Sequence, residues 1–375
     1  MKSHLHLLQI DLHFQDYKLA LLCFISAFVV TLIAIPPIIA LINRFRLHDI
    51  PNARKLHTSP IPTMGGIAIM AGMMTGLFMW FPFSTGLAQV CFFFSITVLF
   101  GLGILDDLKD LSARYKFMIQ FGLALLIAVS GIRITTFGGL FGIYELPVSA
   151  QYTFTVVALV GITNAFNLID GIDGLAGGLG FMSLVTLGFI LTINGDAYTA
   201  LIAFALAGGI LAFLYFNFNP AKIFMGDTGS LVLGFVTAVL CIRLIQVNEM
   251  VANPVIPHAP VFVLGIVLIP VYDTIRVFAL RIWRGKSPFE ADKTHIHHLL
   301  TNQGFTHGFA AKLICFIHGF VLIEVYWLRG LRQELVAGIL LIIMLLTTVL
   351  MKKMGGLYKR VHTSLPRQEK SMAHE

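Results

Sequence analysis

A stretch from Asn164 to Gly178 places two carboxamides and two carboxylates at the end of an apolar run. Asn164, Asn167, Asp170 and Asp173 recur every third residue, so on a helix their side chains would form one polar stripe. Amide and carboxylate oxygens suit a hard cation such as Mg²⁺, and the glycines that follow permit close approach of the backbone to a ligand. The stripe predicts a metal, a ligand or a partner helix as its target, the alternative being a polar helix end followed by flexible glycines.

Three acidic residues, Asp106, Asp107 and Asp110, end another apolar run. If that helix continues, Asp107 and Asp110 share a face while Asp106 points about 100° away, so Asp106 and Asp107 need different partners. Carboxylates at a helix C-terminus oppose the helix macrodipole. The pattern therefore indicates that another group stabilises them, and the alternative is a solvated helix end paired with Lys109 and Arg114.

The segment from Phe224 to Ser230 places one carboxylate, Asp227, at the expected start of a helix. As an N-cap, Asp227 would satisfy free backbone N–H groups of that helix and have a purely structural role. Its second interpretation is a metal-binding carboxylate. Phe224 offers a flat surface for a base.

A histidine cluster, His295-Ile-His-His298, follows Asp292 and lies among arginines and lysines. His295 and His298 are three residues apart, which could suit zinc on a helix, but no cysteine joins them and the surrounding positive charge would repel a cation. Histidines among arginines and lysines suit a phosphate better. A tolerated surface loop is the alternative.

Two further groups have simple interpretations. The basic, proline-containing turn from Arg54 to Gly66 could reflect membrane topology alone, and Asp273 could simply pair with Arg276. Together, however, these segments combine hard-metal ligands with phosphate-binding cations. That combination predicts phosphoryl transfer, in which catalysis rests on positioning and charge neutralisation, and the apolar surroundings indicate a lipid reactant.

The elements that must position these residues are membrane helices. Of the 375 residues, 57% are hydrophobic and only 12% are charged, and the mean hydropathy is +0.85, which lies outside the range of soluble globular proteins. We therefore expect an all-α polytopic membrane protein. The four cysteines lie in apolar runs and predict no disulfide framework. The net charge of +7 is explained by the loops and not by nucleic-acid binding.

Apolar runs of roughly 17–25 residues predict about eleven transmembrane helices. The first is kept as a span and not as a signal peptide, because no cleavage site follows it. The predicted spans lie near residues 19–42, 65–84, 86–105, 117–131, 152–169, 179–194, 196–216, 228–248, 258–280, 308–328 and 334–351.

Lysines and arginines gather in one set of loops, which the positive-inside rule makes cytoplasmic. We expect the N-terminus outside, the C-terminus in the cytoplasm and the active site built from cytoplasmic loops. Residues 1–351 would form one integral membrane transferase domain, and residues 352–375 a basic, disordered cytoplasmic tail. The charge of the tail would act as a topology signal alone, the favoured interpretation, or would also attract the tail to anionic lipids.

The ordered motifs resemble the polyprenyl-phosphate N-acetylhexosamine-1-phosphate transferases, of the glycosyltransferase family 4 type. The similarity covers most of the chain, from Pro51-Asn-Ala-Arg-Lys-Leu-His57 through Asp106-Asp107, the stretch from Asn164 and Phe-Met-Gly-Asp227 to Ser287–His298. The last segment looks like the branch that loads N-acetylglucosamine 1-phosphate onto undecaprenyl phosphate for O-antigen, enterobacterial-common-antigen-like or teichoic-acid-linker synthesis. The peptidoglycan branch, which transfers phospho-MurNAc-pentapeptide, is similar but carries three consecutive histidines, whereas Ile296 interrupts the run here.

The resemblance implies roles for individual residues. Asp227, with Asn167 nearby, would bind Mg²⁺, for which Mn²⁺ is a substitute, and Asp106 and Asp107 would bind or deprotonate the lipid phosphate. The other implied residues bind the substrates: Lys116, His297 and His298 at phosphates; Asp170, Asp173 and Phe224 at the nucleoside; Asn164 and His295 elsewhere on the substrate; and Lys55 to Thr63 at the entrance.

The implied partners are a UDP-N-acetylhexosamine, undecaprenyl phosphate and the lipid bilayer, without nucleic acid, and a homodimer is compatible with the family. A lipid phosphate oxygen would attack the β-phosphorus in line and release UMP, on the cytoplasmic side of a bacterial plasma membrane. A two-step route through an aspartyl phosphate is the chemical alternative.

Two other classes of protein compete with this interpretation. A secondary transporter also uses intramembrane carboxylates, but places its site near the bilayer midplane, whereas these acids lie at helix ends on one side. A lipid-binding scaffold that kept the pocket without catalysis is the second.

Overall fold

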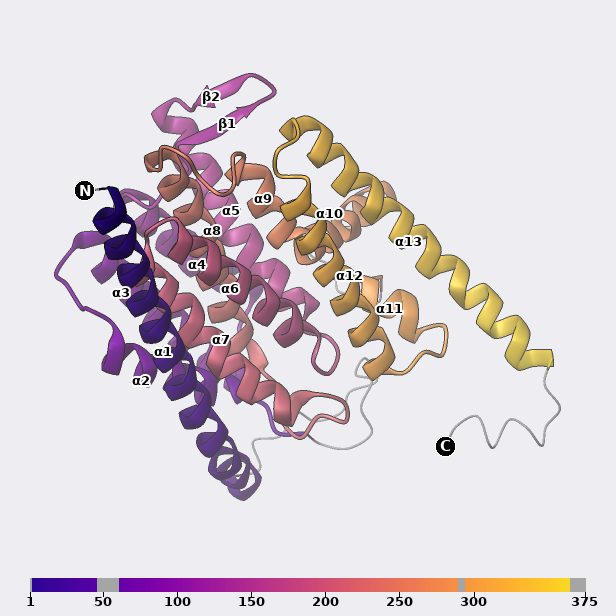
Figure 1. Ribbon diagram of the computed structural model, residues 1–375. Helices are drawn as coiled ribbons and strands as arrows, with labels where there is room; N and C mark the ends of the chain where they lie inside the picture. Colours follow the sequence, from indigo (N-terminus) through magenta and orange to yellow (C-terminus); the bar gives the residue numbers. More distant parts are fainter. Residues whose placement is uncertain (1, 46–60, 289–293, 365–375) are drawn as a thin grey trace.

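The computed structural model describes residues 2–45, 61–288 and 294–364, and in these ranges the chain is mostly helical (Figure 1). One antiparallel hairpin of β1 (Thr136–Leu140) and β2 (Ile143–Glu145) interrupts the described helices. The helices are α1 (Lys2–Phe45), α2 (Gly65–Trp80), α3 (Leu87–Lys109), α4 (Ala113–Val129), α5 (Val148–Ile169), α6 (Leu175–Ile193), α7 (Ala197–Asn217), α8 (Gly226–Met250), α9 (Ala259–Ile266), α10 (Leu268–Trp283), α11 (Ile296–Thr301), α12 (His307–Trp327) and α13 (Gln333–Ser364).

The chain is a polytopic, all-α membrane protein, as its composition predicts. In the described ranges, 8 helices are long and apolar enough to cross a membrane: α1, α3, α5, α6, α7, α8, α12 and α13. The pair α9 and α10 makes one more span if it is counted as a single bent helix. Two further helices are shorter: the apolar α2, with 16 residues, and α4, with 17. Every predicted span coincides with one of these helices or with the bent pair.

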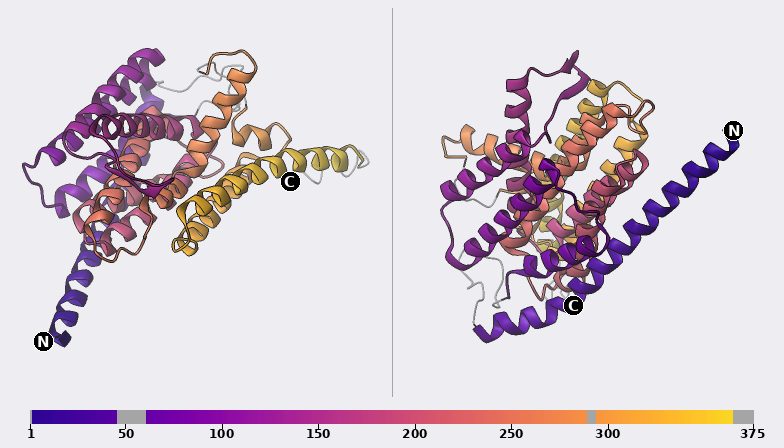
Figure 2. Two further views of the ribbon diagram at one scale, coloured as in Figure 1. Left: turned by 90° about the horizontal axis from the view of Figure 1, so that it is seen from above. Right: turned by 90° about the vertical axis from the view of Figure 1, so that its left-hand side faces the viewer.

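Helix α8 forms the centre of the bundle. Of its most apolar window, 89% is buried inside the protein, compared with 28% for both α1 and α13. Helices α2, α3, α5 and α6 pack around α8, and α1 packs on α2 and α7. α1 and α13 therefore lie at opposite edges of the bundle (Figures 1 and 2). Whatever fixes the first turn of α8 also fixes the centre of the fold.

That first turn is packed closely against α2 and α3 through glycines. A Cβ atom added at Gly103 would lie 2.4 Å from the Cα atom of Thr228, and one added at Gly66 would lie 2.2 Å from the backbone nitrogen of Gly229. In a membrane, the hydrophobic effect does not drive helices together. Helices associate there through close packing, which small residues such as glycine allow. The Gly65 N–H also donates to the carbonyl of Phe224 at 2.8 Å, so the N-terminal end of α2 is hydrogen-bonded to the segment just before α8.

Three features differ from the sequence-based expectation. The predicted span over 258–280 is broken at Val267, where α9 and α10 meet at 75°. Residues 132–150, which lie between two predicted spans and for which no element was predicted, contain the hairpin. The Gln333 side chain donates to the carbonyl of Gly138 at 2.9 Å. α13 continues to Ser364 into the predicted tail, while residues 365–375 lie outside the described part of the chain.

The close packing at Gly103 predicts that Gly103→Ala destabilises the protein. The added methyl group meets backbone atoms of Thr228 that cannot move alone, so we expect a loss of about 1–3 kcal/mol, as for other overpacked sites. The measurement is thermal unfolding of the purified protein in detergent, followed by tryptophan fluorescence.

Gly101→Ala is the matched control, because it lies on the same helix and its Cβ atom would meet nothing within 4 Å. This change should be neutral, or stabilising by up to about 1 kcal/mol through helix propensity. Equal shifts of the unfolding temperature in the two variants would rule out the close contact at Gly103.

Candidate active site

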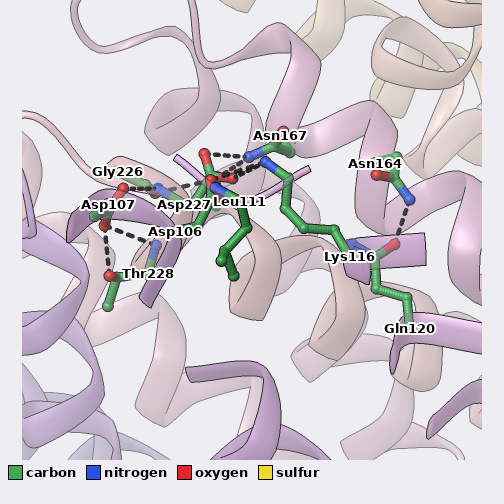
Figure 3. Close-up of polar contacts among 11 residues, drawn as sticks. Asp106, Asp107, Leu111, Lys116, Gln120, Asn164, Asn167, Gly226, Asp227 and Thr228 are labelled. Atoms are coloured by element: carbon green, nitrogen blue, oxygen red, sulfur yellow. Dashed lines mark hydrogen bonds and ion pairs between the residues drawn. The ribbon is translucent and has the colours of Figure 1, made fainter. Parts of the chain in front are cut away.

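Asp107 caps α8 from another helix (Figure 3). Its Oδ1 atom accepts a hydrogen bond from the Asp227 N–H at 2.8 Å, and its Oδ2 atom accepts from the N–H of Thr228 at 3.1 Å and from the Thr228 hydroxyl. The N-cap residue of α8, Met225, makes no side-chain cap of its own. Because the first N–H groups of a helix lack helical partners and carry partial positive charge, a carboxylate is favourable there. This is the stabilisation that an acid at the C-terminal end of α3 requires.

Because Asp107 caps the first N–H groups of α8, the side chain of Asp227 faces other partners. Asp227 lies inside the first turn of α8, so its interpretation as the N-cap residue is wrong. Its Oδ2 atom lies 3.0 Å from the Lys116 ammonium, and its Oδ1 atom accepts from the Asn167 amide at 2.9 Å. The same amide nitrogen donates to the hydroxyl of Ser230 at 2.9 Å. Asp227 therefore joins α4, α5 and α8 at one point.

Lys116 bridges two carboxylates. Its Nζ atom lies 2.8 Å from Asp106 Oδ2 and 3.0 Å from Asp227 Oδ2. The other oxygen of Asp106 accepts from the N–H of Leu111 at 2.8 Å, in the turn that joins α3 to α4. Asp106 and Asp107 thus have different partners, as their angular separation on a helix predicted. The expected alternative, a solvated helix end, does not fit either side chain.

The stretch that starts at Asn164 divides into two parts. α5 ends at Ile169, so Asp170 and Asp173 lie in the following turn, and the expected stripe of four side chains on one helix is wrong. Asn167 reaches Asp227, whereas Asn164, one helical turn earlier, donates to Gln120 of α4 and to a carbonyl of its own helix. Asn164 therefore joins two helices and lies beside the carboxylate cluster, which consists of Asp106, Asp107 and Asp227 with Lys116.

The turn after α5 is held by two inward-facing polar side chains. Asp173 is 3% exposed, and one of its oxygens accepts from the Asn219 amide at 3.1 Å and from the Ala221 N–H at 3.0 Å. Asn217 accepts from the N–H of Gly174 at 2.8 Å and donates to the carbonyl of Ile223 at 2.8 Å. The sequence-based reasoning assigned no role to Asn217. The available signal was an asparagine at the end of an apolar run that leads into the segment containing Asp227.

Asp170 lies where negative charge accumulates. Burial of its carboxyl group raises its pKa to about 7, and the charges of Asp227, Asp107 and Asp173 add to the effect. A carboxyl group with such a pKa is partly protonated near neutral pH. The cluster therefore holds more negative charge than its own ammonium group neutralises.

The histidine cluster is positioned by a second carboxylate cap. Asp273 of α10 accepts from the N–H of Ile296, the first residue of α11, at 2.9 Å, and lies 2.9 Å from His295 Nδ1. The predicted pair with Arg276 is confirmed at 2.7 Å, but Asp273 also holds α11. His295 therefore faces Asp273 through Nδ1, and its role in binding a substrate stays a prediction.

His297 connects α11 to the turn after α5. Its side chain is 2% exposed and packs on Gly171, where an added Cβ atom would lie 2.5 Å from Nε2. Burial, followed by the neighbouring His298, lowers the pKa of His297 to about 3, so this imidazole is neutral at physiological pH. It can contribute a hydrogen bond to a phosphate but no positive charge. His298 lies next to it, with ring centroids 4.3 Å apart.

Two further predicted residues, Phe224 and Thr63, lie near the N-terminal end of α8. Phe224 and Thr63 are both half-buried, and the Phe224 N–H donates to the carbonyl of Pro62 at 2.8 Å. Lys55 lies outside the described residues.

Among the residues that the structure describes, no three His, Cys, Asp or Glu side chains converge as a metal site. Magnesium that is shared with substrate phosphates needs only one or two protein ligands, and the adjacent side chains of Asp227 and Asn167 match that requirement.

The cap predicts that Asp107→Asn weakens the fold as well as the site. Replacing a carboxylate oxygen with an NH₂ group at the start of α8 removes an acceptor and a favourable charge, which we expect to cost about 0.5–2 kcal/mol. Asp110→Asn is the control, because Asp110 is exposed at the end of the same helix and asparagine tolerates its positive φ of 50°. Thermal unfolding in detergent compares them, and an unchanged unfolding temperature in Asp107→Asn would contradict the cap.

Comparisons with known proteins agree with these motifs. Residues 89–245, which include the carboxylate cluster and Lys116, match the family described as Glycosyl transferase family 4. The chain is 37% identical over 308 residues to a probable undecaprenyl-phosphate N-acetylglucosaminyl 1-phosphate transferase of Bacillus subtilis, covering 79% of this chain and 82% of the relative.

Two enterobacterial relatives are named undecaprenyl-phosphate alpha-N-acetylglucosaminyl 1-phosphate transferase. The protein of Escherichia coli K12 is 34% identical over 276 residues, which are 72% of each chain. The protein of Yersinia pestis is 36% identical over 279 residues, covering 72% of this chain and 73% of the relative. With this identity over most of both chains, the chain belongs to glycosyl transferase family 4, as its motifs predicted.

Proposed function

We propose that the chain transfers N-acetylglucosamine 1-phosphate from UDP-N-acetylglucosamine to undecaprenyl phosphate and releases UMP. The observation that carries the proposal is the position of Lys116 between Asp106 and Asp227, with Asn167 on the second oxygen of Asp227. This arrangement combines one phosphate-binding cation with ligands for a hard metal. Relatives at 34–37% identity that bear the name of this activity support it.

The proposal includes an orientation in the bacterial plasma membrane. About eleven spans would include the two short helices and the bent pair α9–α10, with the N-terminus outside and the site facing the cytoplasm. Basic residues at the same helix ends as the site support this orientation through the positive-inside rule: Lys109, Arg114, Lys222, Arg281 and Arg284. A homodimer, which the family resemblance allows, stays a prediction.

The lipid phosphate needs little help from a base. It is largely ionised at neutral pH, so an oxygen can attack the β-phosphorus of the donor in line and displace UMP. Asp106, held by Lys116 and by the N–H of Leu111, aligns the ammonium group that meets the phosphates. Both oxygens of Asp107 are engaged by α8, so its contribution is to hold Asp227 in place.

Magnesium fits the donor set of the site. The carboxylate of Asp227 and the amide of Asn167 offer the hard oxygen ligands that Mg²⁺ prefers, and Mn²⁺ shares that preference. Burial, together with the charges of Asp227, Asp107 and Asp173, raises the pKa of Asp170 to about 7, and a nearby cation would favour the ionised form of this carboxyl group. When bound, the ion would neutralise charge on the donor pyrophosphate.

The direct test is UMP release by the purified protein with undecaprenyl phosphate, Mg²⁺ and different UDP-sugars. We expect activity with UDP-N-acetylglucosamine and none with UDP-MurNAc-pentapeptide, and we expect Asp227→Asn to lower kcat by about 10²-fold or more, as for other lost charge-stabilising groups. Full activity in Asp227→Asn would contradict the metal assignment. Activity with UDP-MurNAc-pentapeptide alone would favour the peptidoglycan branch. Enzyme that becomes covalently labelled by a labelled donor in the absence of undecaprenyl phosphate would favour the two-step route through an aspartyl phosphate.

The charge excess gives a separate prediction for stability against pH. Because the pKa of Asp170 is raised to about 7 from 3.8, the folded state binds this proton more tightly than the unfolded state, so stability falls as the pH rises towards 7. Without Mg²⁺, the unfolding temperature of the wild-type protein should therefore fall between pH 5 and about pH 7. It should level off above this range, where Asp170 is ionised in both the folded and the unfolded state.

Asp170→Asn should flatten this pH dependence, whereas Asp110→Asn should keep it. Mg²⁺ should raise the wild-type unfolding temperature more at the upper end of the pH range, where the carboxylates are ionised. Thermal unfolding with EDTA or Mg²⁺ at each pH gives the comparison. A wild-type slope in Asp170→Asn would contradict the charge cluster.

A further inference from the structure

The bend between α9 and α10 removes a helical partner from one backbone carbonyl. In a continuous helix, the N–H of residue 270 would donate to the carbonyl of Ile266. Residue 270 is proline, which has no N–H, and its ring displaces the carbonyl four residues earlier. Ile266 is 0% exposed. A carbonyl that is buried inside a membrane protein needs a hydrogen-bond partner from the protein, because an unsatisfied polar group away from water is costly.

A serine on another helix supplies that partner, and a histidine on a third helix hydrogen-bonds to the serine. The hydroxyl of Ser183 on α6 donates to the carbonyl of Ile266 at 3.0 Å, and the same oxygen lies 3.1 Å from Nε2 of His318 on α12. A serine hydroxyl has one proton. Since that proton points to Ile266, Nε2 of His318 must donate to the serine oxygen. Ser183 and His318 are both 0% exposed, so α6, α12 and the bend are joined inside the protein.

The direction of α10 after the bend decides where the histidines lie. Asp273 lies about two helical turns beyond Ile266, and it caps α11 through the N–H of Ile296. α11 in turn holds His297 against Gly171, next to Asp170. A change in the bend would therefore move the histidine cluster relative to the carboxylate cluster.

We propose that Ser183 and His318 are positioning residues for the transferase reaction. They fix the bend between α9 and α10 and thereby the place of α11 against the turn after α5. Both side chains lie in hydrogen bonds away from the carboxylate cluster, so they act on the site through α10. The kinetic part of this inference rests on the proposed function, and the structural part does not.

The kinetic test compares removal of each hydrogen bond with its conservative replacement. Ser183→Ala and His318→Phe should lower kcat for UMP release roughly tenfold or more and leave the KM for the donor about unchanged. His318→Gln keeps an N–H donor, so its kcat should stay within about threefold of the wild-type value. Nδ1 of His318 has no hydrogen-bond partner among the described residues, so glutamine loses nothing there.

Thr186→Val is the matched control. It removes a hydroxyl from the same helix, α6, but one that donates only within that helix, to the carbonyl of Met182 at 2.8 Å. It should keep the wild-type kcat. Wild-type kcat in Ser183→Ala and His318→Phe, or an equal loss in Thr186→Val or His318→Gln, would overturn the proposal.

A distance measurement tests the bend without any activity. Spin labels at positions 275 on α10 and 316 on α12, both exposed side chains, are introduced in a chain whose native cysteines are replaced by alanine. Ser183→Ala should shift or broaden the distance distribution from pulsed electron spin resonance, and Thr186→Val should not. Unchanged distances in Ser183→Ala would overturn the role at the bend. If the wild type released no UMP, the proposed function would fail while this measurement still decided the bend.

Discussion

The arrangement of the site depends on the hydrogen bonds between Asp107 and the first turn of α8. A helix that begins in a buried place must find acceptors for its first N–H groups, and a Ser, Thr, Asp or Asn side chain at its own N-terminus is the usual solution. Here the acceptors come from α3. The acid on α8 itself, Asp227, is therefore left to face Lys116 and Asn167. Asp107 satisfies the first N–H groups of α8, so the carboxylate of Asp227 is available for the proposed reaction.

The same device recurs at the second half of the site. α11 is too short to be stable alone, and its first N–H donates to Asp273 on α10. Both caps join elements that are distant in sequence, and both lead to the C-terminal end of α5. Asp227 contacts Asn167 in the last turn of α5, and His297 packs on Gly171 just beyond it. The site is therefore built from helix ends that hold one another and not from independent loops.

The sequence predicted the class of fold because long apolar runs have no other stable place than a membrane. It also predicted that Asp106 and Asp107 have different partners, since that follows from helix geometry alone. It failed where an outcome depends on contacts between distant segments. The N-cap of α8 and the end of the polar stripe at Ile169 are of this kind. The break at Val267 could have been expected from Pro270, but prolines are tolerated in membrane helices when neighbours satisfy the freed groups.

The charges in the site set a physical condition on the proposed reaction. Lys116 is the cation that contacts Asp106 and Asp227 in the described part of the chain, and it is already neutralised by them. Asp107 and Asp170 add further negative charge, while His297 is neutral. Two anionic substrates would have to enter this field against Coulomb repulsion, which is strong where water is scarce. A divalent cation bound near Asp227 would remove this repulsion and would leave Lys116 able to donate to a phosphate. The dependence on a metal would then follow from the charge balance of the carboxylates and not from a preformed cage of ligands.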